Sequence, residues 1–275
     1  MEIHAADCKV SVPDRDDRKR SRQHMNKPAI LRLEPGGPSN VVWTTLALDQ
    51  EDFQSELPEQ HWHIYFEDAQ LGLTVGVWTT TPMQEAFGPY PGDEFMIILE
   101  GRVALLDGDD RQIGVKQGEI FVVSNGLPIS WKQEGFCRKF FMTYQPQDTP
   151  PAKTDCADGT ISVLNAAALE PLLQTVKSSR QAITAADTLQ LSESICCTND
   201  TGNMVSGLMQ SEAFETTMAP SPHHELVQIL TGHVQITEAR GHVHEFRSGD
   251  VFFLPAGSRC AWRASPACQQ VFLSR

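Results

Sequence analysis

The chain has 275 residues, a hydrophobic fraction of 40% and a formal net charge of −13 at pH 7. A surface this acidic repels phosphate backbones, which argues against nucleic acid as a partner and favours a small molecule or another protein. No apolar run reaches the length of a membrane span. The seven cysteines show no CxxC spacing, so a reducing, cytoplasmic setting fits best.

In chain order, residues 1–26 carry a mixed run of charges without an apolar core and are predicted to form a disordered tail. Short apolar runs separated by turn residues follow over 27–145, as in the hairpin pattern EFMIILEGRVALLDGDDRQIGV. A segment rich in Pro, Asp and Thr predicts a linker over 146–159 and a second domain over 160–275. Because only Asn165–Ile183 is helix-like, the predicted fold class is all-β, with two tandem barrels.

An internal repeat organises both domains. Shifting the sequence by 131 residues aligns Val75–Met142 with Ser206–Leu273 without a gap. The register keeps several glycines, prolines and aromatic residues in place: Gly76 with Gly207, Pro89 with Pro220, Glu94 with Glu225, Gly101 with Gly232, Gly118 with Gly249, Gly126 with Gly257 and Trp131 with Trp262. The two domains are therefore expected to share one fold with this constant offset.

Each repeat contains a glutamate, six residues, a glycine, a second glycine further on, and a final glycine in a turn. These elements are E94-FMIILE-G101 with G118-EIFVV-SNG126, and E225-LVQILT-G232 with G249-DVFFL-PAG257. The pattern resembles the cupin superfamily, so the chain is expected to be a bicupin of two jelly-roll barrels. It is most similar to the branch with the ethanolamine-utilisation cupin protein and, more distantly, to ureidoglycine aminohydrolase. The resemblance implies a metal or small-molecule site in the barrel mouth.

Most of the metal ligands that the resemblance implies are replaced. In domain one, the positions of the family's histidine pair are Gly88 and Tyr90, or Phe87 and Pro89 under a longer spacing, and Ile129 is at the third position. This domain is therefore predicted to hold no metal. In domain two the corresponding residues are Ala219 and Ser221, or Met218 and Pro220 under the longer spacing, with Cys260 at the third position. However, His223 and His224 precede Glu225. His223, Glu225 and Cys260 are therefore candidate ligands for one divalent ion, such as Zn, Mn, Fe or Ni. The alternative places the two histidines in a loop and makes Cys260 a small buried hydrophobe.

Two further histidine pairs are interpreted as structural. The string of His61, His63 and Glu67 resembles a ligand motif, but its repeat equivalents are Ser192, Ser194 and Thr198, so it is expected to be an early strand with alternating polar side chains. His242 and His244 precede Gly249 and are interpreted as the solvated face of a hairpin.

The retained carboxylates, Glu94 and Glu225, are the candidate catalytic residues, either as general acids or bases or as counter-ions for a bound amine. Candidate pocket residues are Trp78, Tyr90, Trp131, His224 and Trp262. Domain two, with more potential partners for its glutamate, is expected to be the working site.

Three functional classes follow. The first is a metabolic enzyme (isomerase, lyase or hydrolase) acting on an amine- or ureide-like or other small polar metabolite. The second is a metal-free metabolite-binding module, and the third an assembly protein. The strand segments FMIILE and LVQILT are apolar on both sides, so either the other domain or a second chain is expected to cover their outer faces. A homodimer through a sheet face is the predicted assembly.

Overall fold

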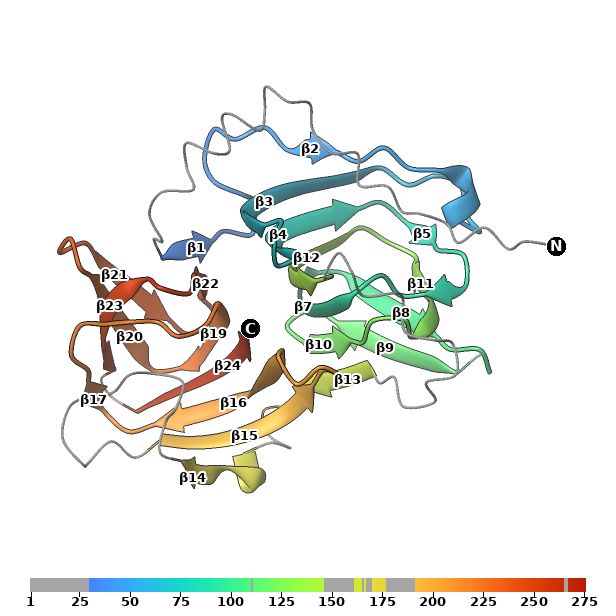
Figure 1. Cartoon of the computed structure of the whole chain (residues 1–275). Coiled ribbons are helices and arrows are strands. Elements are labelled where there is room, and N and C mark those ends of the chain that lie inside the picture. Colours follow the sequence, from blue (N-terminus) through green and yellow to red (C-terminus); the bar gives the residue numbers. More distant parts are fainter. Residues whose placement is uncertain are drawn as a thin grey trace.

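The computed structural model of the chain describes residues 30–109, 111–145, 161–164, 166, 170–176, 191–264 and 267–275 (Figure 1). The tail expected over 1–26 and the linker expected over 146–159 lie outside these residues. The described chain folds into two units of the same design, each made of a seven-stranded sheet facing a five-stranded sheet. Among the described residues, no helix has the length and hydropathy needed to cross a membrane.

In the first unit, the larger sheet runs in the order β13 (Ile161–Leu164), β10 (Ile120–Val123), β7 (Asp93–Glu100), β12 (Cys137–Tyr144), β4 (Leu73–Thr80), β3 (Gln60–Asp68) and β2 (Thr44–Thr45). The facing sheet contains β5 (Met83–Gln84), β11 (Pro128–Gln133), β8 (Arg102–Leu106) and β9 (Gln112–Lys116), with β6 (Gly88–Pro89) paired to β11. A short 3-10 turn, η1 (Gln50–Asp52), precedes β3.

In the second unit, the larger sheet runs in the order β1 (Leu31–Leu33), β22 (Val251–Leu254), β19 (Glu225–Thr231), β24 (Cys268–Ser274), β16 (Val205–Ser211), β15 (Leu191–Thr198) and β14 (Gln174–Val176). Its facing sheet contains β17 (Phe214–Glu215), β23 (Arg259–Ala264), β20 (His233–Glu238) and β21 (Val243–Arg247), with β18 (Ala219–Pro220) paired to β23. We call the unit with β7 barrel 1 and the unit with β19 barrel 2. Their two sheets remain separate ladders in the described chain, so neither barrel is closed.

The pairing registers confirm the predicted offset of 131 residues. Glu94 lies opposite Val123, and Glu225 lies opposite Leu254, its exact repeat equivalent along β22. The backbone at Gly101, directly after β7, explains why the motif has a glycine at this position. Gly101 has φ +85°, and a Cβ atom there would lie 2.3 Å from the carbonyl oxygen of Phe136. Only glycine accepts both the positive φ and the close backbone approach.

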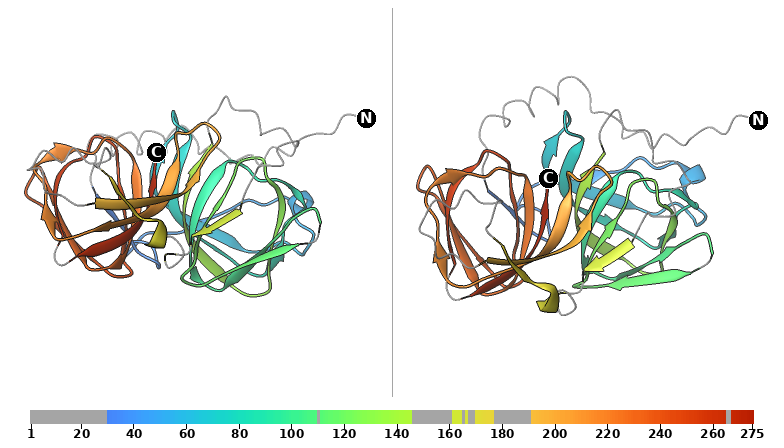
Figure 2. Two further views of the ribbon diagram at one scale, coloured as in Figure 1. Left: turned by 90° about the horizontal axis from the view of Figure 1, so that it is seen from below. Right: turned by 60° about the horizontal axis from the view of Figure 1, so that its bottom comes forward.

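The two halves of the chain exchange one strand. Strand β1 comes from the first half but pairs with β22 of barrel 2, and β13 comes from the second half but pairs with β10 of barrel 1. Figure 2 shows the two units side by side, with the yellow strand β13 beside the green strands. Leu33 and Leu164 are repeat equivalents, and both are buried. The expected domains 27–145 and 160–275 therefore each give one strand to the other's sheet.

The outer faces of the two large sheets pack against each other. Alternate residues of β7 divide between two cores: Phe95 and Ile97 contact the interdomain cluster, whereas Met96 and Ile98 lie inside barrel 1. On β19, Leu226 joins the same interdomain cluster. The sequence predicted that either the other domain or a second chain covers the outer faces of these strands. In the structure, the other domain covers them.

The helix-like stretch Asn165–Ile183 was misassigned in part. Its described portion contains a 3-10 turn, η2 (Glu170–Leu172), followed directly by strand β14, which forms an edge of the barrel 2 sheet. Hydrogen bonding to β15 there outweighs the local helical preference of the sequence. Residues 177–183 lie outside the described chain.

Candidate functional site

The fold brings together the positions that the family motif assigns to a metal. In barrel 1, Gly88 lies opposite Ile129 across strands β6 and β11, and the Tyr90 hydroxyl donates a hydrogen bond to the Glu94 carboxylate. In barrel 2, Ala219 lies opposite Cys260 in the same way. The predicted geometry is present, but the side chains differ from a metal-binding cupin.

Barrel 1 holds a buried ion pair at its centre. The ammonium group of Lys139, on β12, lies 2.9 Å from Oε1 of Glu94, at the start of β7. Glu94 is 7% exposed and Lys139 is 6% exposed. The glutamate that ligates a metal in cupins thus has a cation supplied by the chain itself. A buried ion pair stabilises the fold only when the other polar atoms of both side chains also have hydrogen-bond partners.

Aromatic rings complete the surroundings of Lys139. Its Nζ atom lies 4.9 Å from the centroid of Trp78 and 4.6 Å from that of Trp131, within cation–π range. The indole N–H groups are fixed by two glutamines: Trp78 donates to Gln60, and Trp131 donates to Gln133 at 2.7 Å. The two tryptophans predicted to surround Glu94 therefore do so, with a lysine between them.

Glu85 is a second carboxyl group near this pair. Burial raises its pKa from 4.5 to about 7; Lys139 opposes the rise, and the negative charges of Glu94 and Asp52 add to it. The pKa of Tyr90 is also raised, first by burial and then by Glu94, so its hydroxyl stays protonated and donates. The surroundings of the ion pair therefore include the Tyr90 hydroxyl as a proton donor and the half-buried Glu85, whose pKa is raised.

Sequence reasoning missed Lys139 and Glu85. A signal for Lys139 was available in the strand CRKFFMTY, because Cys137 and Phe141 face the interior of barrel 1 and Lys139 lies between them on the same side. Glu85 offered less, since it lies just after the two-residue strand β5 and no local pattern fixes its direction.

The centre of barrel 2 lacks the lysine. Glu225 is buried at the start of β19, and Trp262 is buried against Phe252 with a centroid separation of 5.7 Å. The repeat equivalent of Lys139 is Gln270, which donates a hydrogen bond to the sulfur of Met209, itself the equivalent of Trp78. A neutral amide and a thioether thus stand where barrel 1 has an ammonium and an indole.

The metal set predicted for domain two does not assemble. Among the described residues, His223, Glu225 and Cys260 are not a group whose ligand atoms lie close together. His223 lies in a bend before β19, where its backbone carbonyl accepts a hydrogen bond from the Ser221 hydroxyl. Burial raises the pKa of Cys260 to about 11, with Glu225 and Glu238 adding to the rise, so the thiol stays protonated.

His224 was wrongly assigned to the pocket of barrel 2. Its ring stacks on Phe253 with an interplanar angle of 8° and contacts Phe66 of barrel 1. Its Nδ1 atom accepts a hydrogen bond from the backbone N–H of Ala256. Since side chains alternate along an extended strand, His224 and Glu225 point to opposite faces, and His224 belongs to the contact between barrels.

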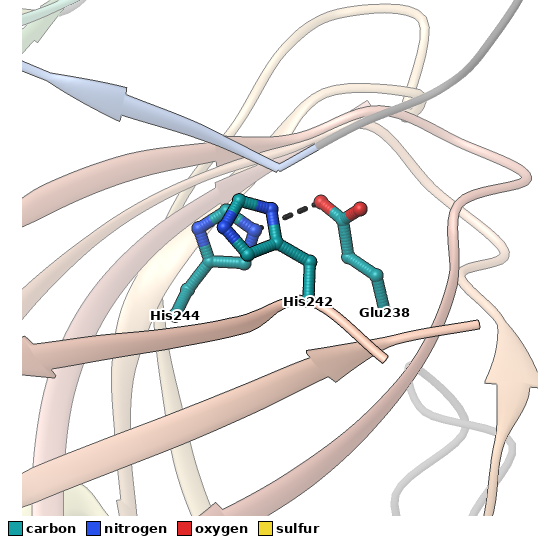
Figure 3. A group of neighbouring side chains, drawn as sticks. All are labelled: Glu238, His242 and His244. Atoms are coloured by element: carbon teal, nitrogen blue, oxygen red, sulfur yellow. Dashed lines mark hydrogen bonds and ion pairs between the residues drawn. The ribbon is translucent and has the colours of Figure 1, made fainter. Parts of the chain in front are cut away.

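One three-residue group in the described chain has the composition and proximity of a metal site. The ligand atoms of Glu238, His242 and His244 all lie within 4.8 Å of one another (Figure 3). Glu238 ends β20, His242 precedes β21 and His244 lies on β21, so the β20–β21 hairpin brings them together. The Nε2 atom of His244 lies 2.9 Å from Oε1 of Glu238.

The surroundings of this hairpin group hold Glu238 in place. Its Oε1 atom also accepts a hydrogen bond from the backbone N–H of Ile30, next to the exchanged strand β1, which passes beside the group in Figure 3. The interpretation of His242 and His244 as a solvated face is correct for His242, which is exposed. It is wrong for His244, whose side chain is 18% exposed and which stacks over the buried Phe246.

The other histidine pair is not a site. His61 and His63 lie on β3, as predicted for an early strand, and the His61 ring contacts the Thr45 hydroxyl. The ring of His63 packs edge-on against Tyr65, and burial lowers the pKa of His63. Neither histidine belongs to a potential metal group in the described chain.

Comparison with known proteins supports the assignment of the fold. A family model described as the EutQ-like cupin domain matches residues 198–272. A protein of unknown function from Pseudomonas syringae pv. tomato, of the DUF861 family, superposes with a TM-score of 0.72 and 20% identity, covering 90% of this chain and 100% of that one. The second repeat thus matches the EutQ-like cupin domain, and the chain as a whole shares the fold of the DUF861 protein.

Two further solved cupin-like structures share the architecture at lower similarity. A cupin 2 conserved barrel domain protein from Leptotrichia buccalis has a TM-score of 0.53 and 10% identity, covering 78% of this chain and 88% of its own. The DUF861 protein Ylba from E. coli has a TM-score of 0.52 and 12% identity, covering 93% and 96%. No curated protein matches the chain.

The positions that hold a metal in the cupin motif do not suit a metal in this chain. A divalent transition metal needs several imidazole, thiolate or carboxylate ligands. Barrel 1 offers carboxyl groups without an imidazole or a thiolate, and its Glu94 is already paired with Lys139. Barrel 2 offers Glu225 with a protonated thiol. If this protein binds a metal, the donor set that fits is the hairpin group of Glu238, His242 and His244.

Proposed function

We propose that this cupin acts on a small polar metabolite in barrel 2, with the help of one divalent metal ion held by Glu238, His242 and His244. The observation that carries the proposal is the convergence of two imidazoles and a carboxylate within 4.8 Å on one hairpin. Barrel 1 has Asp107, Arg111 and Ile113 at the equivalent positions, where Arg111 pairs with its neighbouring aspartates. The proposed centre is therefore particular to barrel 2.

The donor set indicates which metals suit it. Two histidines and one carboxylate leave coordination positions open, as in catalytic zinc sites and non-haem iron sites, and Mn or Ni also accept these ligands. A metal bound here supplies a Lewis acid for an oxygen atom of the metabolite. The backbone N–H of Ile30 supports the carboxylate, as outer hydrogen bonds commonly do for metal ligands.

The hairpin group lies next to the centre of barrel 2. Glu238 is the cross-strand partner of Cys260, and both Glu238 and Glu225 raise the pKa of that thiol. A metabolite reaching from the hairpin toward Glu225 would meet a carboxylate that favours an amine or ureide nitrogen. This placement supports an amine- or ureide-like substrate and isomerase, lyase or hydrolase chemistry. A cytoplasmic setting and a homodimer through a sheet face remain parts of the proposal.

The proposal is tested by metal binding to the full chain after treatment with a chelator. Titration calorimetry with Zn, Mn, Ni and ferrous iron is expected to show one site per chain. His244→Ala should weaken that affinity at least about 10-fold, because it removes one of three ligands. His233→Ala is the matched control, since His233 lies on the same hairpin but outside the group. Equal binding by the His244→Ala variant and the wild type would refute the site.

The second candidate is a metal-free metabolite-binding or assembly protein. It is favoured by barrel 1, whose central carboxylate is already neutralised by Lys139. A thermal-shift screen of small amines and ureides against the metal-free and the metal-loaded chain separates the candidates. Shifts that need the metal support the first candidate, and shifts unaffected by the metal support the second.

A further inference from the structure

The centre of barrel 1 has the composition of a receptor for an organic ammonium ion. A carboxylate, two indole faces and a thioether surround one point, and the group at that point is Nζ of Lys139. The distances from Nζ are 2.9 Å to Glu94 and 3.0 Å to the sulfur of Met96. Proteins that bind alkylammonium ligands use the same combination of aromatic faces and a negative charge.

The walls of this cage are held independently of the lysine. Trp131 donates its indole N–H to Gln133, and the amide of Gln133 donates in turn to the backbone carbonyl of Thr81. Trp78, on β4, donates to Gln60 on the neighbouring strand β3. The Tyr90 hydroxyl donates to the second oxygen of Glu94. Each wall residue thus has a polar partner other than Lys139, so the cage is expected to keep its shape without the ammonium group.

We infer that barrel 1 contains a primary-ammonium binding site that the chain fills with its own Lys139, in the place where other cupins hold a metal. The lysine supplies the positive charge that the buried Glu94 requires, and it closes the barrel to an external ligand. Truncation of the lysine opens a site for a free primary alkylammonium ion. This inference does not depend on the hairpin metal site or on the proposed activity of barrel 2.

Charge and shape support a primary ammonium as the ligand. Glu94 carries the one full negative charge in direct contact, and Tyr90 remains a neutral donor because its pKa is raised. An ammonium donates to the carboxylate and presents its C–H and N–H edges to the indole faces. A divalent metal finds no imidazole here, because Tyr90 and Ile129 replace the expected histidines.

Lys139→Ala in the full chain tests the inference by chemical rescue. The substitution removes three methylene groups and the ammonium, and it leaves Glu94 buried without its cation. The midpoint of thermal unfolding should fall by roughly 10 °C. Propylammonium chloride, which replaces the missing atoms, should raise the midpoint of the variant and change its tryptophan fluorescence in a saturable titration. Potassium chloride at equal ionic strength and 1-propanol should do neither.

Two matched variants sharpen the rescue. Lys139→Met fills the space without the charge, so propylammonium should not stabilise it. Lys116→Ala removes an exposed lysine and should leave both the midpoint and the response to amine unchanged. Failure of propylammonium to stabilise the folded Lys139→Ala variant overturns the inference, and so does stabilisation of that variant by Zn or Mn in place of the amine.

A second measurement covers the case in which Lys139→Ala does not fold. The Glu94→Gln and Lys139→Met changes are combined, which removes both charges of the pair at once. The double variant should unfold at a higher temperature than Lys139→Met alone, because no unpaired charge remains buried. Additive losses from the two single changes would show that the lysine does not serve as the cation of Glu94, and would overturn the inference.

Discussion

The two barrels share one backbone register but differ in the side chains around the same glutamate, for example Lys139 against Gln270, Trp78 against Met209, and Tyr90 against Ser221. Barrel 1 compensates its buried carboxylate with a lysine and two aromatic faces. Barrel 2 places neutral side chains there and carries its ionisable cluster on the β20–β21 hairpin. Glu94 and Glu225 therefore occupy equivalent positions on their strands, but the side chains around each glutamate determine its chemical role.

The largest expected difference between the barrels is in the unfolding free energy that is lost when each glutamate is replaced by glutamine. Glu94→Gln removes the carboxylate that pairs directly with the buried Lys139, which is expected to cost about 3 kcal/mol of unfolding free energy. Glu225→Gln strands no such lysine, because the matched residue is Gln270, and should cost about 1 kcal/mol. Urea unfolding of the two variants measures both values. Equal costs would show that the two centres are electrostatically alike.

The exchanged strands test whether the barrels are also equivalent where they join. Leu33→Ala on β1 and Leu164→Ala on β13 each remove a buried leucine from the interdomain cluster, and each should cost about 2–4 kcal/mol. Because each strand completes the other barrel's sheet, either change should lower the stability of the whole chain in a single unfolding transition. Val163→Ala, on the exposed side of β13, is the control and should have little effect. Loss of one barrel alone would contradict this coupling.

Sequence reasoning captured the fold through the repeat. Gly101 and Gly232 each combine a positive φ with a close backbone carbonyl, which only glycine accepts. These glycines therefore predict where the preceding strands end. The strand exchange was not predictable in this way. The β1 and β13 segments are repeat equivalents with the same buried leucine, so their local pattern does not indicate which barrel each strand joins.

The candidate sites were less predictable because side-chain partners come from distant segments. Glu94 was found from its motif, but its partner Lys139 lies 45 residues further along the chain. For the hairpin group, a pattern was available: Glu238 has the same parity as the buried Ile236, and His244 has that of the buried Phe246. The metal set with His223 failed because the chain bends before β19 and does not extend the strand alternation to that residue.

Glu85 provides a pH test particular to barrel 1, since its repeat equivalent is Thr216. Its pKa is raised in the folded chain from 4.5 to about 7. A raised carboxyl pKa gives a stability contribution that is present below pH 4.5 and is lost as the pH rises through about 7. Glu85→Gln, which stays neutral, should therefore be more stable than the wild type by about 3 kcal/mol near pH 8.

The same difference should shrink to near zero below the ordinary pKa of a carboxyl group, where Glu85 is protonated in both states. Urea unfolding across this pH range measures it. Glu119→Gln is the control, because Glu119 lies near the surface and pairs with the exposed Lys116. A stability difference between Glu85→Gln and the wild type that does not change with pH would show that the pKa of Glu85 is not raised in the folded chain.

Cys260 gives the smallest expected effect and separates the two candidate metal sets of barrel 2. Burial holds its pKa at about 11, so the thiol is protonated near neutral pH, and a metal would have to displace that proton before binding. The hairpin group needs no thiolate. Cys260→Ala should therefore change the affinity for Zn by less than about 3-fold, against at least about 10-fold for His244→Ala. Titration of both variants at one pH decides the matter. A larger loss in the cysteine variant would return the metal to the Glu225 side of the barrel and would make the hairpin histidines a surface feature.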